Sequence, residues 1–177
     1  MKILVTAASK HGSTDEIATD IAEGLRQRGL DAAVRHPEDV TSLDHYVAVI
    51  IGSAVYNGQW LAPAKSFVDR WSHALKERQV WLFSSGPAGD PPKPTQIKAV
   101  DVAAIVAATN ARAHQVFAGK IDKAALGFAE RTVVRTLHIG DGDSRDWSQI
   151  DAWAGEIAEA LTAGGGPGSP KATRASG

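Results

Sequence analysis

The sequence predicts one α/β domain, with a parallel sheet covered by helices on both faces. Two continuous apolar runs, residues 3–7 and 47–51, are rich in β-branched residues and are typical of strands buried on both faces. Segments with apolar residues at helical spacing follow several of the predicted strands, and this alternation favours right-handed crossovers between parallel strands. A chain of 177 residues is long enough to bury the core of such a domain without disulfides or metals.

Three further segments are predicted to be strands. Residues 80–83 and 114–118 have the same apolar character as the first two runs. Residues 32–35 are a weaker candidate, which we expect at an edge of the sheet. Five strands are therefore expected in all.

The first predicted helix spans residues 14–28, because Ile17, Ile21 and Leu25 recur one helical turn apart. Gly29 follows it, at a position where helices commonly end. Three more helices are expected, at residues 61–75, 96–109 and 146–161.

Two of these helices carry N-terminal signals. Pro63 is acceptable in the first turn of the second helix, where its missing N–H is not needed. Asp146 and Gln149 have the spacing of a capping box at the start of the last helix. We expect strand and helix to be repeated five times, with a loop-rich insert near residues 120–145.

The composition excludes several classes of protein. The chain has no Cys, which excludes disulfides, thiol nucleophiles and Cys-ligated metals, and its His residues show no metal-ligand spacing. The net charge is -1, which gives no signature of nucleic-acid binding. No apolar run approaches the roughly 20 residues of a membrane span, so we expect a cytoplasmic protein with at most peripheral membrane contact. Residues 1–161 are expected to form the domain, and the Gly-, Pro- and Ser-rich residues 162–177 a disordered tail.

The segment between the first strand and the first helix has the composition of a phosphate-binding loop: Ser9, Lys10, His11, Gly12, Ser13 and Thr14. Small residues let backbone N–H groups approach an anion, and hydroxyls and a helix N-terminus add to the attraction. The Walker and dinucleotide patterns are both missing, which leaves a monophosphate group as the ligand. The alternatives are that Ser13 or Thr14 only caps the helix and that Lys10 and His11 are simply solvated.

This loop, Ser-x-x-Gly-x-Thr with Ile-Ala following inside the helix, resembles the FMN-phosphate loop of flavodoxins. The chain is similar to the flavodoxin-like family that includes menaquinone-dependent protoporphyrinogen dehydrogenase. The similarity extends in short pieces over nearly the whole expected domain, at residues 14–18, 52–58, 67–68, 116–119 and 146–147. His11 departs from the flavodoxin loop, which often has Thr at that position.

The resemblance implies a flavodoxin-like three-layer sandwich, with five parallel strands in the order 2-1-3-4-5 and FMN at their carboxyl ends. Beyond the first loop, it implies that FMN contacts two more strand ends, namely Ser53, Ala54, Val55, Tyr56, Asn57 and Gly58, and then Ser84, Ser85, Gly86 and Gly89. Tyr56 is the first candidate for stacking on the flavin ring and Trp60 the second. For each aromatic residue, the alternative is packing against the following helix.

The resemblance and the near-neutral charge together predict an FMN-dependent oxidoreductase related to protoporphyrinogen or quinone chemistry. Its partner would be a small-molecule substrate or a quinone acceptor, and flavin chemistry needs no protein nucleophile. One alternative is an electron-transfer flavodoxin with a redox protein partner, although such carriers tend to be acidic. Another is a binding protein that keeps the fold without flavin. Residues 121–137, which mix apolar and basic side chains, are expected either to cover a substrate or to pack on the core.

Overall fold

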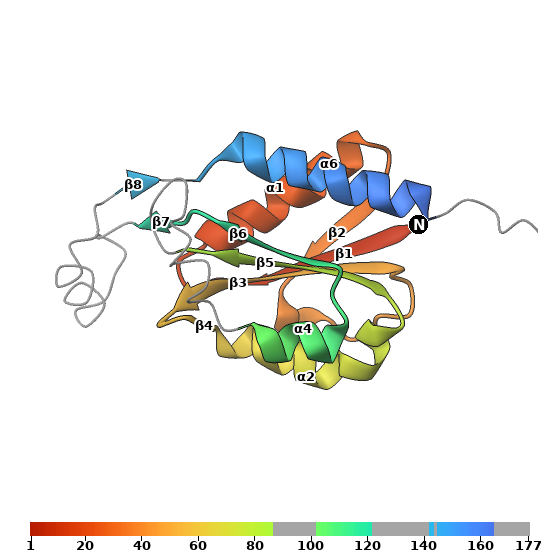
Figure 1. The fold of residues 1–177 in the computed structure, drawn as a ribbon, viewed down its shortest axis with the longest axis horizontal. Coiled ribbons are helices and arrows are strands. Elements are labelled where there is room, and N and C mark those ends of the chain that lie inside the picture. The colour runs from red at the N-terminus through yellow and green to blue at the C-terminus, as the bar shows by residue number, and fades with distance from the viewer. Residues whose placement is uncertain (87–101, 122–141, 144, 165–177) are drawn as a thin grey trace, which may run out of the picture.

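The computed structural model describes residues 1–86, 102–121, 142–143 and 145–164 (Figure 1). Its main sheet contains five parallel strands: β1 (Lys2–Ala8), β2 (Asp31–Arg35), β3 (Ala48–Tyr56), β5 (Gln79–Ser85) and β6 (Ala113–Phe117). They are ordered β2-β1-β3-β5-β6. Counting only these parallel strands, this is the expected order 2-1-3-4-5, and the flavodoxin-like fold is confirmed.

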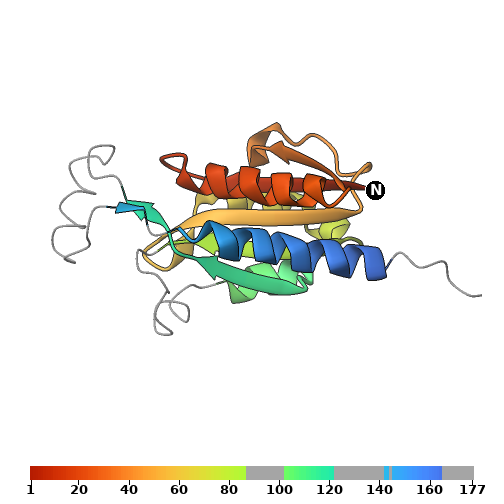
Figure 2. The ribbon, with the colours of Figure 1, turned by 90° about the horizontal axis from the view of Figure 1, so that it is seen from above.

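The helices lie in two layers, one on each face of the sheet (Figures 1 and 2). On one face lie α1 (Ser13–Gln27) and α6 (Trp147–Ala163), and on the other α2 (Ala62–Lys76) and α4 (Ala103–Thr109). The expected start of the third helix at residue 96 lies outside the described residues. The last helix continues two residues past the expected domain boundary at 161, and residues 165–177 are not described.

The expectation that strand and helix are repeated five times is wrong after β2. Only a short 3-10 helix, η1 (Pro37–Asp39), separates β2 from β3. The chain has to pass only β1 to reach β3, and this segment already buries Val40 and Leu43 in the core on the α2 face. A short irregular connection is therefore sufficient here.

The strand β3 also extends beyond the apolar run at residues 47–51 that predicted it. Gly52 and Ser53 still pair with Ala7 and Ala8 of β1, and β3 extends to Tyr56. There it turns back into β4 (Gln59–Trp60), which pairs antiparallel with β3. Residues 53–56 thus belong to a strand, since Ser53 and Ala54 stay paired with β5 and Val55 and Tyr56 pair with β4, which satisfies their backbone groups.

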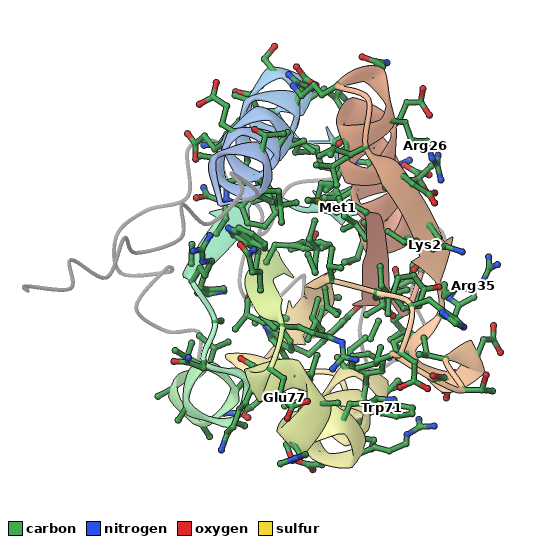
Figure 3. All side chains as sticks on the ribbon, turned by 90° about the vertical axis from the view of Figure 1, so that its right-hand side faces the viewer. Met1, Lys2, Arg26, Arg35, Trp71 and Glu77 are labelled. Carbon is green, nitrogen blue, oxygen red and sulfur yellow. The ribbon has the colours of Figure 1, made fainter. Side chains whose placement is uncertain are left out.

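The core lies on both faces of the sheet. Figure 3, which views the fold from the end where β1 begins, shows side chains filling the space between the sheet and each helical layer. Under α6, the rings of Phe83, Phe117 and Trp153 form a cluster with centroids 5.6–6.2 Å apart. Gly52 lies against this cluster, since a Cβ built on it would lie 2.1 Å from Cζ of Phe83.

The start of α6 agrees with the sequence signal. A carboxylate oxygen of Asp146 accepts a hydrogen bond from the backbone N–H of Gln149, 3.1 Å away. Just before it, the two-residue strands β7 (Lys120–Ile121) and β8 (Gly142–Asp143) form an antiparallel ribbon at the base of the expected insert. The predicted covering role of residues 121–137 falls almost entirely outside the described residues. None of the helices in the described ranges is long and apolar enough to cross a membrane.

Candidate functional site

The first loop connects the carboxyl end of β1 to α1. Gly12 has a φ of 86° and is the N-cap of α1. A residue other than glycine is strained in this left-handed conformation. A Cβ built on Gly12 would meet no atom within 4 Å, so the backbone here faces open space. The loop therefore exposes its backbone where a ligand can approach.

Two backbone N–H groups of this loop converge on a single oxygen. The hydroxyl of Ser9 accepts hydrogen bonds from the N–H of Gly12 at 2.9 Å and from the N–H of Thr14 at 3.3 Å. Two convergent amide donors at the first turn of a helix are the geometry that stabilises an anionic oxygen. Two N–H groups at the start of α1 thus point to one position, which the Ser9 hydroxyl occupies in this structure.

The hydroxyl of Thr14 is fully buried and has no hydrogen-bond partner. Other unpartnered buried groups among the described residues lie inside the strands or in α2, on Thr6, Gln79 and Trp71. Thr14 alone of these four lies beside the converging amides. A buried hydroxyl without a partner costs about 1–3 kcal/mol, and a phosphate oxygen in the loop would provide the missing partner.

The alternative that Ser13 or Thr14 caps α1 is wrong. Gly12, which has no side-chain oxygen, occupies the N-cap position, and the hydroxyl that accepts from the first turn belongs to Ser9 and not to Ser13 or Thr14. His11 is exposed at the tip of the loop. Capping therefore does not explain why hydroxyl residues are present at positions 13 and 14.

The first loop and the end of β3 meet at the same rim of the sheet. The ammonium of Lys10 lies 5.3 Å from the ring centroid of Tyr56, which is 37% exposed. Partial burial raises the pKa of the Tyr56 phenol, which keeps it neutral. Tyr56 therefore presents a flat, uncharged ring beside the loop.

Tyr56 is held by a tight hairpin turn. Asn57 and Gly58 have φ values of 51° and 75°, as a two-residue turn of type I′ requires. Ala54 pairs with Ser85 of β5, and Val55 pairs with Trp60 of β4. The residues predicted at the end of β3 thus lie at the carboxyl end of the sheet, and strand pairing holds their backbone in place.

The hydroxyls of Ser53 and Ser84 are engaged inside the protein. Ser53 Oγ accepts from the N–H of Leu61 at 2.9 Å and donates to the carbonyl of Ala54 at 2.8 Å. Ser84 Oγ accepts from the indole N–H of Trp60 at 2.8 Å and lies 2.7 Å from Nε2 of His114. Both serines are fully buried, so these hydroxyls anchor the hairpin and do not face the rim.

Trp60 is 2% exposed, and the idea that it could stack on a ligand is wrong, since its ring belongs to the core on the α2 face. His114 was not singled out by the sequence, although its imidazole completes this buried network. Burial lowers the pKa of His114, which favours the neutral ring at neutral pH. A single His in an apolar strand gives no sequence signal for such a contact.

The third predicted strand end is partly described. Gly86 has a φ of 92°, and its N–H donates to the carbonyl of Phe117 at 3.0 Å. Gly119 lies so close that a Cβ built on it would be 3.0 Å from Cα of Gly86. Ser85 is buried beside them, and Gly89 lies outside the described residues.

Sequence reasoning did not find Arg145, which reaches the first loop from the start of α6. Its guanidinium donates to the carbonyl of Ser13 at 3.2 Å and lies over the ring of Trp147, with 4.6 Å from Cζ to the ring centroid. Trp147 is 40% exposed. Because Ser13 and Arg145 are 132 positions apart, no local pattern in the sequence could have indicated this contact.

A family model described as a flavodoxin domain matches residues 4–148. The chain belongs to the flavodoxin domain family. This membership agrees with the cofactor expected from the sequence, since FMN is the cofactor of flavodoxins. The match does not separate electron carriers from the protoporphyrinogen dehydrogenase type. A search of curated proteins found no significant match.

Solved structures agree with the flavodoxin fold. The chain superposes on an archaeal flavodoxin with a TM-score of 0.61 and 18% identity, covering 92% of this chain and 99% of that one. A flavodoxin of Streptococcus pneumoniae gives a TM-score of 0.61 and 20% identity, with coverage of 93% and 99%. The rubredoxin:oxygen oxidoreductase of Desulfovibrio gigas gives a TM-score of 0.61 and 18% identity. That match covers 92% of this chain but only 36% of the oxidoreductase.

Proposed function

We propose that this flavodoxin domain is an FMN-dependent oxidoreductase that holds the FMN phosphate in the loop of residues 9–14. The observation that supports the proposal is the convergence of the Gly12 and Thr14 amides on the hydroxyl oxygen of Ser9, beside the unpartnered hydroxyl of Thr14. The first turn of α1 adds partial positive charge to this loop.

The remaining rim residues fit the other parts of the cofactor. Tyr56 offers an exposed ring on which the flavin can stack, and the backbone of residues 54–58 and 84–86 borders the same edge, with Gly89 as a further expected contact. Bound FMN supplies the electron-transfer chemistry, so the protein has to bind, orient and shield it and does not need a nucleophile.

For the reaction, we propose a substrate of the protoporphyrinogen or quinone type. The net charge of -1 favours this over docking to a basic protein carrier. The main alternative is an electron-transfer flavodoxin with a redox protein partner. The size of the chain favours this alternative, because the match covers 99% of each of the two flavodoxins.

An anaerobic reduction of the FMN-loaded protein separates these two functions. The reduced protein is mixed with a quinone or with an oxidised electron-transfer protein, the oxidised protein is mixed with a protoporphyrinogen, and the visible spectrum is followed in each case. Rapid reoxidation by a quinone supports the proposed enzyme. Reoxidation by the protein acceptor alone supports the carrier.

Tyr56→Ala is expected to weaken FMN binding by about tenfold or more, because aromatic stacking on a flat heterocycle contributes about 1–3 kcal/mol. His11→Ala should change the affinity much less, since His11 is exposed at the tip of the loop. Titration of each apoprotein with FMN, followed by flavin fluorescence, measures the difference. Tyr56→Phe is the matched control and should keep most of the affinity. Equal affinities for Tyr56→Ala and His11→Ala would show that the stacking assignment is wrong.

A further inference from the structure

Arg145 is a buried cation between three segments of the chain. Its side chain is only 3% exposed. Nε and Nη2 donate to the two carboxylate oxygens of Asp143 at 2.8 and 2.6 Å, and Nη1 donates to Glu16 of α1 and to the carbonyl of Ser13. One guanidinium thus joins the end of β8, the start of α6 and the first turn of α1.

Contacts on its face and along its edges also fix the orientation of the guanidinium group. It lies over the ring of Trp147, at 4.6 Å from the centroid, while its edges are occupied by the two carboxylates and the Ser13 carbonyl. Hydrogen bonding and charge from Arg145 lower the pKa of Asp143 to about 2, so the pair stays ionised throughout the physiological range. In Figures 1 and 2, α1 and α6 both start at the end of the sheet, along the strand direction, where β7 and β8 lie.

The carbonyl that Arg145 holds belongs to the same peptide unit as the N–H of Thr14. In a trans peptide the C=O and the N–H point in opposite directions. A donor fixed on the Ser13 carbonyl therefore keeps the Thr14 N–H aimed toward the loop, where it meets the Ser9 hydroxyl. A hydrogen bond to the carbonyl also polarises the peptide and makes its N–H a stronger donor.

We propose that Arg145 is a positioning residue for the phosphate loop, which orients the Ser13–Thr14 peptide so that its N–H binds the phosphate of FMN. This assignment rests on the proposed function. It also gives the base of the β7–β8 ribbon a direct connection to cofactor binding, because Asp143 at the end of β8 holds the same guanidinium.

The chain offers a matched control in Arg28. Arg28 makes a bidentate pair with Asp151 of α6 at 2.8 and 3.0 Å and donates to the carbonyl of Gly24 in α1 at 2.8 Å. It therefore joins the same two helices through the same kinds of contact, but beside the C-terminal end of α1, away from the loop. Loss of Arg28 reports the cost of loosening α1 from α6 alone.

The experiment compares Arg145→Met, Arg145→Lys and Arg28→Met with the unchanged protein. Each apoprotein is titrated with FMN and with riboflavin, which lacks the phosphate, and its thermal midpoint is measured. The ratio of the two Kd values isolates the phosphate contribution. Arg145→Met should reduce the preference for FMN by about tenfold, since the Thr14 N–H would lose the contact that orients it as a donor to a charged group. Arg145→Lys, which keeps the charge and one donor, should recover part of the preference, and Arg28→Met should lower only the thermal midpoint.

The possible outcomes separate the two proposals. If the unchanged protein prefers FMN and Arg145→Met keeps the same ratio, the positioning role is wrong and the proposed function stands. If the unchanged protein shows no preference for FMN over riboflavin, the proposed function itself fails. Should Arg145→Met not fold, the ratio for Arg145→Lys decides, because a ratio equal to that of the unchanged protein also overturns the positioning role.

Discussion

Thr14→Val is expected to stabilise the apoprotein slightly and to weaken FMN binding by at least about tenfold. The Thr14 hydroxyl is buried without a partner, so its replacement by a methyl group of similar size removes an unsatisfied polar group. In the FMN complex the same hydroxyl would donate to a phosphate oxygen, and a hydrogen bond to a charged acceptor contributes about 1.5–3 kcal/mol. Urea unfolding of the apoprotein and titration with FMN measure the two opposite effects.

Thr6→Val is the matched control for this experiment. Thr6 is also fully buried with an unpartnered hydroxyl, but it lies within β1 and not in the loop. Both variants should gain stability, and only Thr14→Val should lose FMN affinity. An equal FMN affinity in the two variants, or an equal loss of riboflavin affinity in Thr14→Val, would contradict the role of Thr14 at the phosphate.

Gly52→Ala is expected to destabilise the protein by about 3 kcal/mol or more, because extra atoms in a closely packed core force side chains and backbone to move. The new methyl carbon would lie 2.1 Å from Cζ of Phe83. Phe83 cannot easily withdraw, since its ring packs against Phe117 and Trp153 in the cluster under α6. The free energy of unfolding in urea measures the loss.

Gly29→Ala is the control for the conformational cost of replacing a glycine. Gly29 has a φ of 82° with no atom within 4 Å of its Cβ position, so the substitution adds strain of about 1–2 kcal/mol without a clash. Adding Phe83→Leu to Gly52→Ala should recover part of the lost stability, since the smaller side chain removes the contact. If Gly52→Ala were no more destabilising than Gly29→Ala, the packing described around Gly52 would be incorrect.

Local signals in the sequence predicted much of the fold. The apolar run at residues 3–7 and the spacing of Ile17, Ile21 and Leu25 depend only on neighbouring residues, and β1 and α1 lie where these patterns indicate. Asp146 caps α6 for the same reason, through the half of the predicted capping box in which its carboxylate accepts from the N–H of Gln149. The strand order itself came from the family resemblance, because strand pairing involves residues far apart in the sequence.

The remaining features depend on contacts between distant segments. Ser84 is a small hydroxyl residue at a strand end, which favours a ligand contact. Its hydroxyl instead accepts a hydrogen bond from Trp60 of β4 and contacts His114 of β6. Arg145 reaches Ser13 only after the whole domain has folded. The hairpin of β3 and β4 was not predicted, although it has a local signal. Asn-Gly, here Asn57-Gly58, between two strand-forming segments is typical of a two-residue hairpin turn.

Parallel titrations of the apoprotein with FMN and with riboflavin test the central claim most directly, because the two ligands differ only in the phosphate. If the loop of residues 9–14 binds that phosphate, FMN should saturate one site per chain and bind at least about tenfold more tightly than riboflavin. Flavin fluorescence at a fixed ionic strength gives both dissociation constants. Equal affinities for the two ligands, or no binding of FMN, would contradict the account.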